Sequence, residues 1–288
     1  MRILKLVSSS LSYILWFFLY FYIAWFIFGA NLNSFILVLI VYGGSITIAL
    51  SPIGEVILRV TENCREPWAE HERNYLLPMF EEVYQDAMEL NPKINKGIKL
   101  YIMDAMYVNA FAIGRKTIAV TRGAIETFTA DELKGVLAHE FGHILHGHTK
   151  ALLLSFIGNI IFSIIVWFFR LMFLVTQIVL NIVAEFTALA SFFSIVMSIV
   201  QILVDLSVFV FINLSQIILA MNSRTNEIQA DTFAFEIGYG RELIAGLYLL
   251  QKISINSKAR ISERIKASHP HTAYRIKQLE RLENEAMA

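Results

Sequence analysis

The chain alternates between two long apolar blocks and two polar stretches. Residues 11–51 carry no charged side chain and residues 151–221 carry three, whereas residues 52–150 and 222–288 mix charged, polar and apolar positions. About 20 apolar residues in a helix cross the ~30 Å hydrocarbon core of a bilayer. The blocks therefore predict membrane-spanning helices, and the polar stretches predict parts that fold in water.

The first block predicts a helical hairpin. Leu11–Ala30 and Ser34–Ser51 are both uncharged and long enough to cross the membrane, and only Asn31–Asn33 separates them. Pro52 closes the second run, because proline lacks the N–H that a helix interior needs. We expect the Asn31–Asn33 turn to lie on the opposite side of the membrane from the polar stretches.

The second block is 71 residues long and has three charges: Arg170, Glu185 and Asp205. Its length alone allows two long helices or three. We predict two, Ala151–Phe169 and Leu189–Met221, joined by Arg170–Ala188, because an even number of crossings brings both polar stretches to one side. Together with the first hairpin, this gives an α-helical membrane protein with about four crossings.

Lysine and arginine indicate the orientation. Of the 24 such residues, 23 lie outside the two apolar blocks and would share one side of the membrane. By the positive-inside rule that side is the cytoplasm, which would hold both termini. The single cysteine, Cys64, agrees with a reducing compartment and excludes an intramolecular disulfide. We therefore expect a membrane hairpin, a cytoplasmic part, a second membrane pair and a cytoplasmic helical part: residues 1–51, 52–150, 151–221 and 222–288.

The polar stretches predict a small α+β fold. Apolar residues recur at helical spacing over Trp68–Leu90. Runs rich in β-branched and aromatic residues predict three short strands: Lys99–Met103, Val108–Ile113 and Lys116–Thr121. After the second block the pattern is helical again, over Asn222–Ile237, Glu242–Ile253 and His271–Glu285. We expect a small mixed sheet packed beside a helix.

Residues 129–149 carry the candidate chemistry. Thr129 and Glu132 have the spacing of a capping box, which predicts that a helix begins there. Inside this helix, His139-Glu-Phe-Gly-His143 forms an H-E-x-x-H motif. Two histidines four positions apart share one helix face, so both rings can reach one tetrahedral zinc ion. Glu140 is then placed to take a proton from a water at the metal.

A zinc site with two histidines and a water lacks one protein ligand. The helix after the second block offers Glu227 as that ligand. One turn later, Asp231 could accept the free ring N–H of His139 or His143 and so fix its tautomer.

His146 is the competing candidate for third ligand. It lies seven residues after His139, so along a straight helix at ~1.5 Å per residue their backbones are roughly 10.5 Å apart. Zinc–nitrogen bonds are only about 2.0–2.1 Å long, so three rings from one straight helix cannot converge on one ion. We therefore predict Glu227 as the ligand.

Four motifs occur along the chain with apolar blocks before and between them: Asn109-Ala-Phe-Ala-Ile-Gly, His139-Glu-Phe-Gly-His, Ser223-Arg-Thr-Asn-Glu-Ile-Gln-Ala-Asp, and His269-Pro with Arg275. This arrangement resembles the HtpX-type membrane zinc metalloproteases, relatives of the CAAX prenyl proteases. The resemblance covers nearly the whole chain. It implies a cytoplasmic α+β domain of the gluzincin type, in which a glutamate completes the zinc site.

The resemblance also implies roles for single residues. One zinc ion per chain would have three ligands: His139, His143 and Glu227. Glu140 would be the general base, and His269 and Arg275 would contact the substrate or the developing oxyanion. One departure is visible, because Asn226 stands where the family usually has an arginine.

The function implied by the resemblance is cleavage of damaged or misassembled membrane proteins in a stress response. The enzyme would lie in the plasma membrane of a bacterium, with its active site in the cytoplasm. The expected partners are protein substrates, mainly membrane proteins, and the lipid bilayer. Zero net charge at pH 7 gives no reason to expect a nucleic-acid partner.

The strand Val108–Ile113 is predicted to form the sheet edge over the zinc ion. A substrate would add to this edge as an extra strand, along Asn109, Ala110, Phe111 and Ala112. Backbone pairing tolerates many substrate sequences, which suits a protease that removes damaged proteins.

Three other functions fit parts of the pattern. An intramembrane metalloprotease would place the motif inside an apolar span, but Asp131, Glu132 and Lys134 precede it within two turns. A non-catalytic membrane scaffold would have no need of Glu140. A transporter would need paired ionisable residues within its spans, and the apolar blocks carry few. The pattern therefore favours a protease outside the hydrocarbon core.

Overall fold

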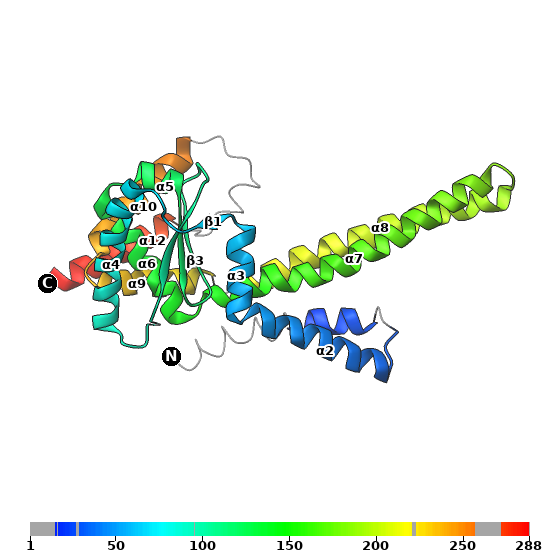
Figure 1. The fold of residues 1–288 in the computed structure, drawn as a ribbon, viewed down its shortest axis with the longest axis horizontal. Helices are drawn as coiled ribbons and strands as arrows, with labels where there is room; N and C mark the ends of the chain where they lie inside the picture. Colours follow the sequence, from blue (N-terminus) through cyan, green and yellow to red (C-terminus); the bar gives the residue numbers. More distant parts are fainter. Residues whose placement is uncertain are drawn as a thin grey trace. The chain divides into compact units, whose positions relative to one another are not determined.

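The computed structural model describes residues 15, 17–26, 29–94, 96–220, 223–256 and 272–287, which are mostly helical (Figure 1). The chain divides into two compact units. We call Met1–Thr47 with Leu154–Met221 the apolar unit, and Ile48–Leu153 with Asn222–Ala288 the sheet unit.

A four-stranded sheet lies at the centre of the sheet unit. Its strands, in the order β1-β2-β4-β3, are Cys64–Arg65, Lys99–Met103, Thr117–Thr121 and Ala110–Ile113. β2 and β4 run parallel, and the other neighbours run antiparallel. The predicted mixed sheet is confirmed, and β3 lies at an edge of it as expected. The two-residue strand β1 was not predicted, because so short a run has no periodicity.

Seven helices of the sheet unit are described: α3 (Pro52–Thr61), α4 (Glu70–Leu90), α5 (Arg122–Thr127), α6 (Ala130–His146), α9 (Ser223–Glu236), α10 (Gly240–Asn256) and α12 (Thr272–Met287). Figure 1 shows α4, α6, α9, α10 and α12 on one side of the sheet and α3 on the other. The apolar core lies between the sheet, α4 and α6, where the ring of Tyr84 stacks on that of Phe141 at 5.3 Å. α6, which carries the H-E-x-x-H motif, is therefore a central helix.

The turn between β3 and β4 is held from two sides. Gly114 has φ of +59°, a conformation that residues with a Cβ rarely adopt. The buried carboxylate of Glu55 in α3 accepts hydrogen bonds from the N–H groups of Arg115 and Lys116, both at 3.0 Å. The hydroxyl of Thr149 donates to the carbonyl oxygen of Gly114 at 2.6 Å. These bonds fix the end of the edge strand to the helix α3 and to the first residue of the helix α7 (Thr149–Ala184).

Three helices among the described residues are long and apolar enough to cross a membrane: Leu32–Ala49, Trp167–Ala184 and Ala188–Val210. The first is α2, and the other two belong to α7 (Thr149–Ala184) and α8 (Ala188–Ala220). The first predicted span, Leu11–Ala30, is described only in part, and a shorter apolar helix covers Phe17–Phe26.

Two connections between apolar helices lie at other residues than the sequence predicts. α7 continues through Arg170 to Ala184, so three residues join it to α8, rather than Arg170–Ala188. The reason is that Asp205 of α8 neutralises Arg170 at 2.8 Å, and the helix need not end at the charge. The first turn lies at residues 29–31 because Asn31 caps α2, with its Oδ1 accepting from the N–H of Ser34 at 2.9 Å.

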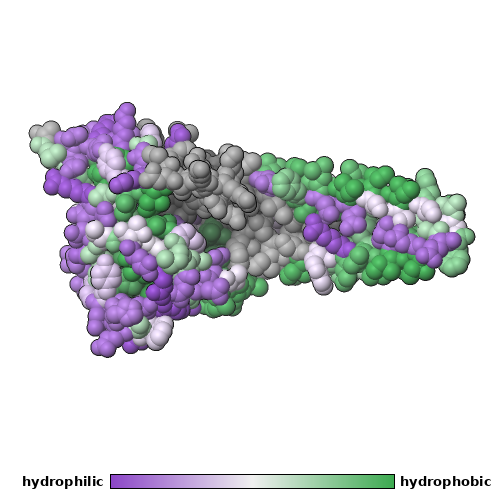
Figure 2. All heavy atoms as spheres, turned by 90° about the horizontal axis from the view of Figure 1, so that it is seen from above, coloured by the Kyte–Doolittle hydropathy of each residue, from purple (hydrophilic) through white to green (hydrophobic). Residues whose placement is uncertain are grey.

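The α7–α8 pair has its polarity inverted relative to the sheet unit. Apolar side chains point outward, with Trp167 64% and Phe186 79% exposed. Polar side chains join the two helices instead: the amide of Gln177 donates to the hydroxyls of Ser194 and Ser198, at 2.7 and 3.1 Å. Figure 2 shows a mostly green surface here, with a line of purple and white atoms along it. This inversion is typical of helices that pack in lipid.

Candidate metal centre

Local signals place the helix that carries the motif. The hydroxyl oxygen of Thr129 accepts from the N–H of Glu132 at 3.3 Å, and the Glu132 carboxylate accepts from the N–H of Thr129 at 2.8 Å. The predicted capping box is therefore confirmed. At the other end, Gly147 adopts φ of +69° and closes α6.

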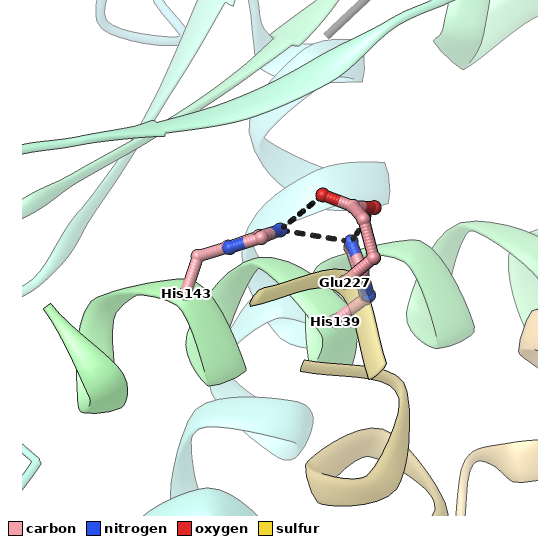
Figure 3. A group of neighbouring side chains, drawn as sticks. All are labelled: His139, His143 and Glu227. Atoms are coloured by element: carbon pink, nitrogen blue, oxygen red, sulfur yellow. Dashed lines mark hydrogen bonds and ion pairs between the residues drawn. The ribbon is translucent and has the colours of Figure 1, made fainter. Parts of the chain in front are cut away.

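Three side chains from α6 and α9 converge in the sheet unit (Figure 3). The Nε2 atoms of His139 and His143 lie 3.0 Å apart. Each of them lies 3.5 Å from a carboxylate oxygen of Glu227. All three side chains are buried. The sequence-predicted donors are therefore brought together, although 84 residues separate His143 from Glu227.

The spacing of these atoms fits a tetrahedral zinc ion. Donor atoms that lie about 2.0–2.1 Å from such an ion are roughly 3.3 Å from one another. The observed separations of 3.0 and 3.5 Å bracket this value. Two histidines and one glutamate are also a known donor set of catalytic zinc sites, which keep a fourth position for water.

Small residues let α9 approach α6 closely enough to deliver Glu227. A Cβ added at Gly142 would lie only 2.8 Å from the Cα of Ala230, so the two backbones are in direct contact there. Gly135 allows the same closeness to α10, where an added Cβ would lie 2.3 Å from the N atom of Leu243. Gly142, inside the motif, is therefore required by the close packing of α6 against α9.

Glu140 is placed beside this cluster on the same helix and is only 1% exposed. It lines a narrow cavity together with His139 and Arg275. Asn109 and Ala110 border the same cavity, whereas Phe111 and Ala112 do not line it. Apolar side chains form the rest of its wall: Val108, Phe128, Val136, Leu243, Leu247 and Leu250.

Asp231 lies against the far nitrogen of the first histidine. Its Oδ1 is 2.8 Å from the Nδ1 of His139, the contact that the sequence offered to either histidine. Burial and Arg275 lower the pKa of His139, but Asp231 and Glu227 outweigh them and the pKa is raised. Burial raises the pKa of Asp231, but Arg275 and His139 outweigh it and the pKa is lowered. Asp231 is therefore ionised near neutral pH.

Arg275 of α12 is held by the carboxylates of α9. Its Nε and Nη2 atoms donate to the two carboxylate oxygens of Asp231, at 2.8 and 2.6 Å. Its Nη1 atom lies 3.1 Å from Glu227 Oε2. The side chain is 3% exposed. Sequence reasoning did not find this contact, because it joins two helices whose spacing in the chain carries no signal.

His148 and Gln229 are further neighbours of the cluster that the sequence did not indicate. The Nδ1 of His148 lies 3.0 Å from the Nδ1 of His143, and its Nε2 lies 2.9 Å from Gln229 Oε1. Burial lowers the pKa of His148 to about 4, so its ring is neutral at physiological pH. The sequence offered one signal for the position of His148, which is Gly147. A glycine in the left-handed conformation after a helix turns the next residue back toward the last helical turn.

Other histidines do not join the described cluster. His146 is exposed, and its Nδ1 donates to the carbonyl oxygen of Gly142 at 2.8 Å. His71 is exposed on α4. His269 and His271 lie outside the described residues.

The chain has relatives among known proteins. The model of peptidase family M48 matches residues 71–283, a stretch that contains the whole cluster. Protease HtpX of Pseudomonas paraeruginosa is 30% identical over 150 residues, which are 50% of this chain and 48% of that protein. A protease HtpX homolog of Helicobacter acinonychis is 47% identical over 62 residues, 20% of each chain. The chain thus spans about half the length of the curated relatives it matches first.

Among solved structures, the crystal structure of S. mikatae Ste24p is similar to this chain. It covers 96% of this chain and 65% of its own, with 20% identity and a TM-score of 0.44, which is too low to establish a shared fold. The resemblance predicted from the four motifs is confirmed by the family match and by the names of the curated relatives.

Proposed function

We propose that this chain, which belongs to peptidase family M48, is a membrane-bound zinc endopeptidase that hydrolyses peptide bonds of misfolded or damaged membrane proteins. The observation that carries the proposal is the convergence of His139, His143 and Glu227 beside Glu140. The curated relatives are themselves called proteases.

Each polar residue of the cavity has a task in this proposal. A zinc ion held by the three donors would lower the pKa of a water in its open position to about 7. Glu140, which is not one of the donors, accepts the proton of the attacking water and passes it to the leaving amine. Arg275 lines the same cavity and, with His269, is proposed to face the developing oxyanion.

The edge strand β3 supports a substrate that binds as an added strand. The N–H of Thr121 donates to the carbonyl oxygen of Asn109 at 3.0 Å, so Asn109 faces β4. Along an antiparallel strand, residues that face the partner alternate with residues that face away from it. The N–H and C=O groups of Ala110 and Ala112 therefore point away from β4. We propose that a substrate peptide pairs with Ala112 at this edge and continues past the cavity beside Glu140.

The membrane part of the proposal follows from the apolar helices. α2, α7 and α8 would lie in the plasma membrane, and the incompletely described segment Leu11–Ala30 would supply a fourth crossing. An even number of crossings on each side of α6 would leave the sheet unit in the cytoplasm, the side that the lysine and arginine residues favour. Protein quality control at that membrane is the role we propose.

The proposal is tested by metal analysis of the purified full chain in detergent, together with a casein-digestion assay. One zinc ion per chain is expected. A chelator should stop cleavage, and added zinc should restore it. Cleavage that persists without bound metal would contradict the proposal.

The substrate strand is tested by Ala112→Pro, which removes one N–H from the open edge. Cleavage should fall while zinc content stays the same, because Ala112 is not one of the donors. Ala112→Ser keeps the N–H and serves as the control. Normal cleavage by the proline variant would show that the substrate binds elsewhere or pairs with the other alternation of the strand.

The topology is tested with single cysteines at Asn33 and Asn256 in a Cys64→Ser background. In sealed vesicles they should react with an impermeant thiol reagent from opposite sides. Reaction of both from the same side would overturn the topology.

A further inference from the structure

The two histidines of the cluster are held differently at the nitrogen that faces away from Glu227. His139 turns its Nδ1 to a carboxylate oxygen of Asp231 at 2.8 Å. His143 turns its Nδ1 to another imidazole, the Nδ1 of His148 at 3.0 Å. Metal-bound histidines usually donate this N–H to a carboxylate, a backbone carbonyl or a water. An imidazole nitrogen accepts a hydrogen bond in only one of its two neutral tautomers, so something must select that tautomer.

Gln229 provides the selection. Its Oε1 lies 2.9 Å from the Nε2 of His148, and an amide oxygen can only accept. The Nε2 of His148 therefore carries the proton, and its Nδ1 presents a lone pair. The Nδ1–H of His143 donates to that lone pair, which leaves the lone pair on His143 Nε2 directed at His139 and Glu227.

The opposite direction of these hydrogen bonds would prevent His143 from binding a metal ion. If the amide of Gln229 donated to His148, the Nδ1 of His148 would donate to His143. The proton of His143 would then sit on Nε2, the atom that lies 3.0 Å from the Nε2 of His139. A nitrogen that carries a proton has no lone pair for a metal. Only one direction of donation leaves the cluster able to bind an ion.

We propose that His148 and Gln229 are positioning residues that fix the tautomer and the ring orientation of the zinc ligand His143. This inference rests on the proposed metal site. It also extends the role of α9, which then supplies the ligand Glu227 and an outer partner for each histidine: Gln229 for His143, through His148, and Asp231 for His139.

The local sequence builds this contact with a short turn. Gly147 adopts a left-handed conformation, and the N–H of His148 donates back to the carbonyl oxygen of His143 at 3.0 Å. The ring of His148 is thereby returned to the last turn of α6. Thr149, the next residue, starts α7, so the outer partner of the ligand lies at the junction of the two helices.

The inference is tested by zinc affinity, measured by chelator competition on the purified full chain. His148→Phe keeps a ring but removes the acceptor, and it should weaken zinc binding about 10- to 100-fold. His146→Phe is the matched control, because that ring stacks on His148 at 5.3 Å from the same helix end without reaching the donors. The control should bind zinc like the wild type.

Two substitutions of Gln229 separate polarity from packing. Gln229→Glu keeps an acceptor toward His148 and should bind zinc within a few-fold of the wild type. Gln229→Lys offers only donors and should lose affinity as His148→Phe does. Equal losses in both would overturn the inference, since a merely structural role does not distinguish donor from acceptor.

The outcomes also separate this inference from the proposed function. A wild-type chain that binds no zinc would refute the metal site itself. A wild-type chain that binds zinc, with His148→Phe and Gln229→Lys binding equally tightly, would overturn only the positioning role. A His148→Phe variant that does not fold leaves the decision to the Gln229 pair.

Discussion

The two units of this molecule treat polar groups in opposite ways. In the sheet unit, the charged side chains of Asp231, Glu227 and Arg275 are buried and held against one another at 2.6–3.1 Å. In the apolar unit, large apolar side chains face outward, and Gln177 hydrogen-bonds Ser194 between the helices. The two patterns fit two environments. In the sheet unit the interior is dry, and its buried charges are paired. In the apolar unit the outer surface is apolar, and polar groups face each other between the helices, as in helices that pack in lipid.

The difference predicts how each unit responds to the loss of a polar group. In the proposed function the buried charges of the sheet unit serve catalysis, so removal of one donor should abolish activity. The apolar unit uses its polar groups for helix pairing, so a paired removal should be tolerated.

The largest effect is expected at the third donor. Glu227→Ala should lose most of the bound zinc and all cleavage, because the cluster is left with two donors. His146→Ala, on the same helix as the other donors, should keep both. Zinc content of the two purified variants decides the matter, and the reverse result would overturn the site as described.

The next effect concerns stability. Arg275→Met leaves the buried carboxylate of Asp231 without its arginine partner, which should destabilise the sheet unit by about 3–5 kcal/mol. Denaturant unfolding of the solubilised protein measures this loss. Arg281→Met is the control on the same helix, because its ion pair with Glu285 is exposed and contributes little. Equal stability of the two variants would show that burial does not determine how much these ion pairs contribute to stability.

Much of the fold was accessible from the sequence because its signals are local. The capping box of Thr129 and Glu132 marked the start of α6, and β-branched runs marked β2, β3 and β4. Glu227 was predicted by counting donors, since a catalytic zinc needs a third protein ligand, and the structure brings it beside both histidines. The helix α3 was missed because Pro52 was interpreted as a stop, although proline is also favoured in the first turn of a helix.

The remaining features depend on contacts between distant parts of the chain. α7 passes Arg170 because Asp205 lies beside it, 35 residues later. His148 reaches His143 through a turn, but its partner Gln229 is 81 residues away. The fork of Arg275 on Asp231 likewise joins separate helices. Periodicity and spacing along the chain carry no information on such pairs.

A smaller effect is expected in the apolar unit. Arg170→Leu leaves Asp205 facing lipid without a partner, at a cost of at most about 2.5–3.5 kcal/mol. The double variant with Asp205→Leu should recover most of that loss, because two leucines leave no unpaired charge in the apolar surroundings. Thermal unfolding in vesicles compares the two. If the double variant is no more stable than the single one, the Arg170–Asp205 pair does more than neutralise two charges between the helices.

The central claim, that this chain is a zinc peptidase with Glu140 as its base, is tested most directly by Glu140→Gln. The purified variant should bind one zinc ion per chain like the wild type, because Glu140 is not a donor, and it should cleave no casein, because the amide cannot accept the proton. Loss of zinc from this variant, or cleavage at the wild-type rate, would contradict the account.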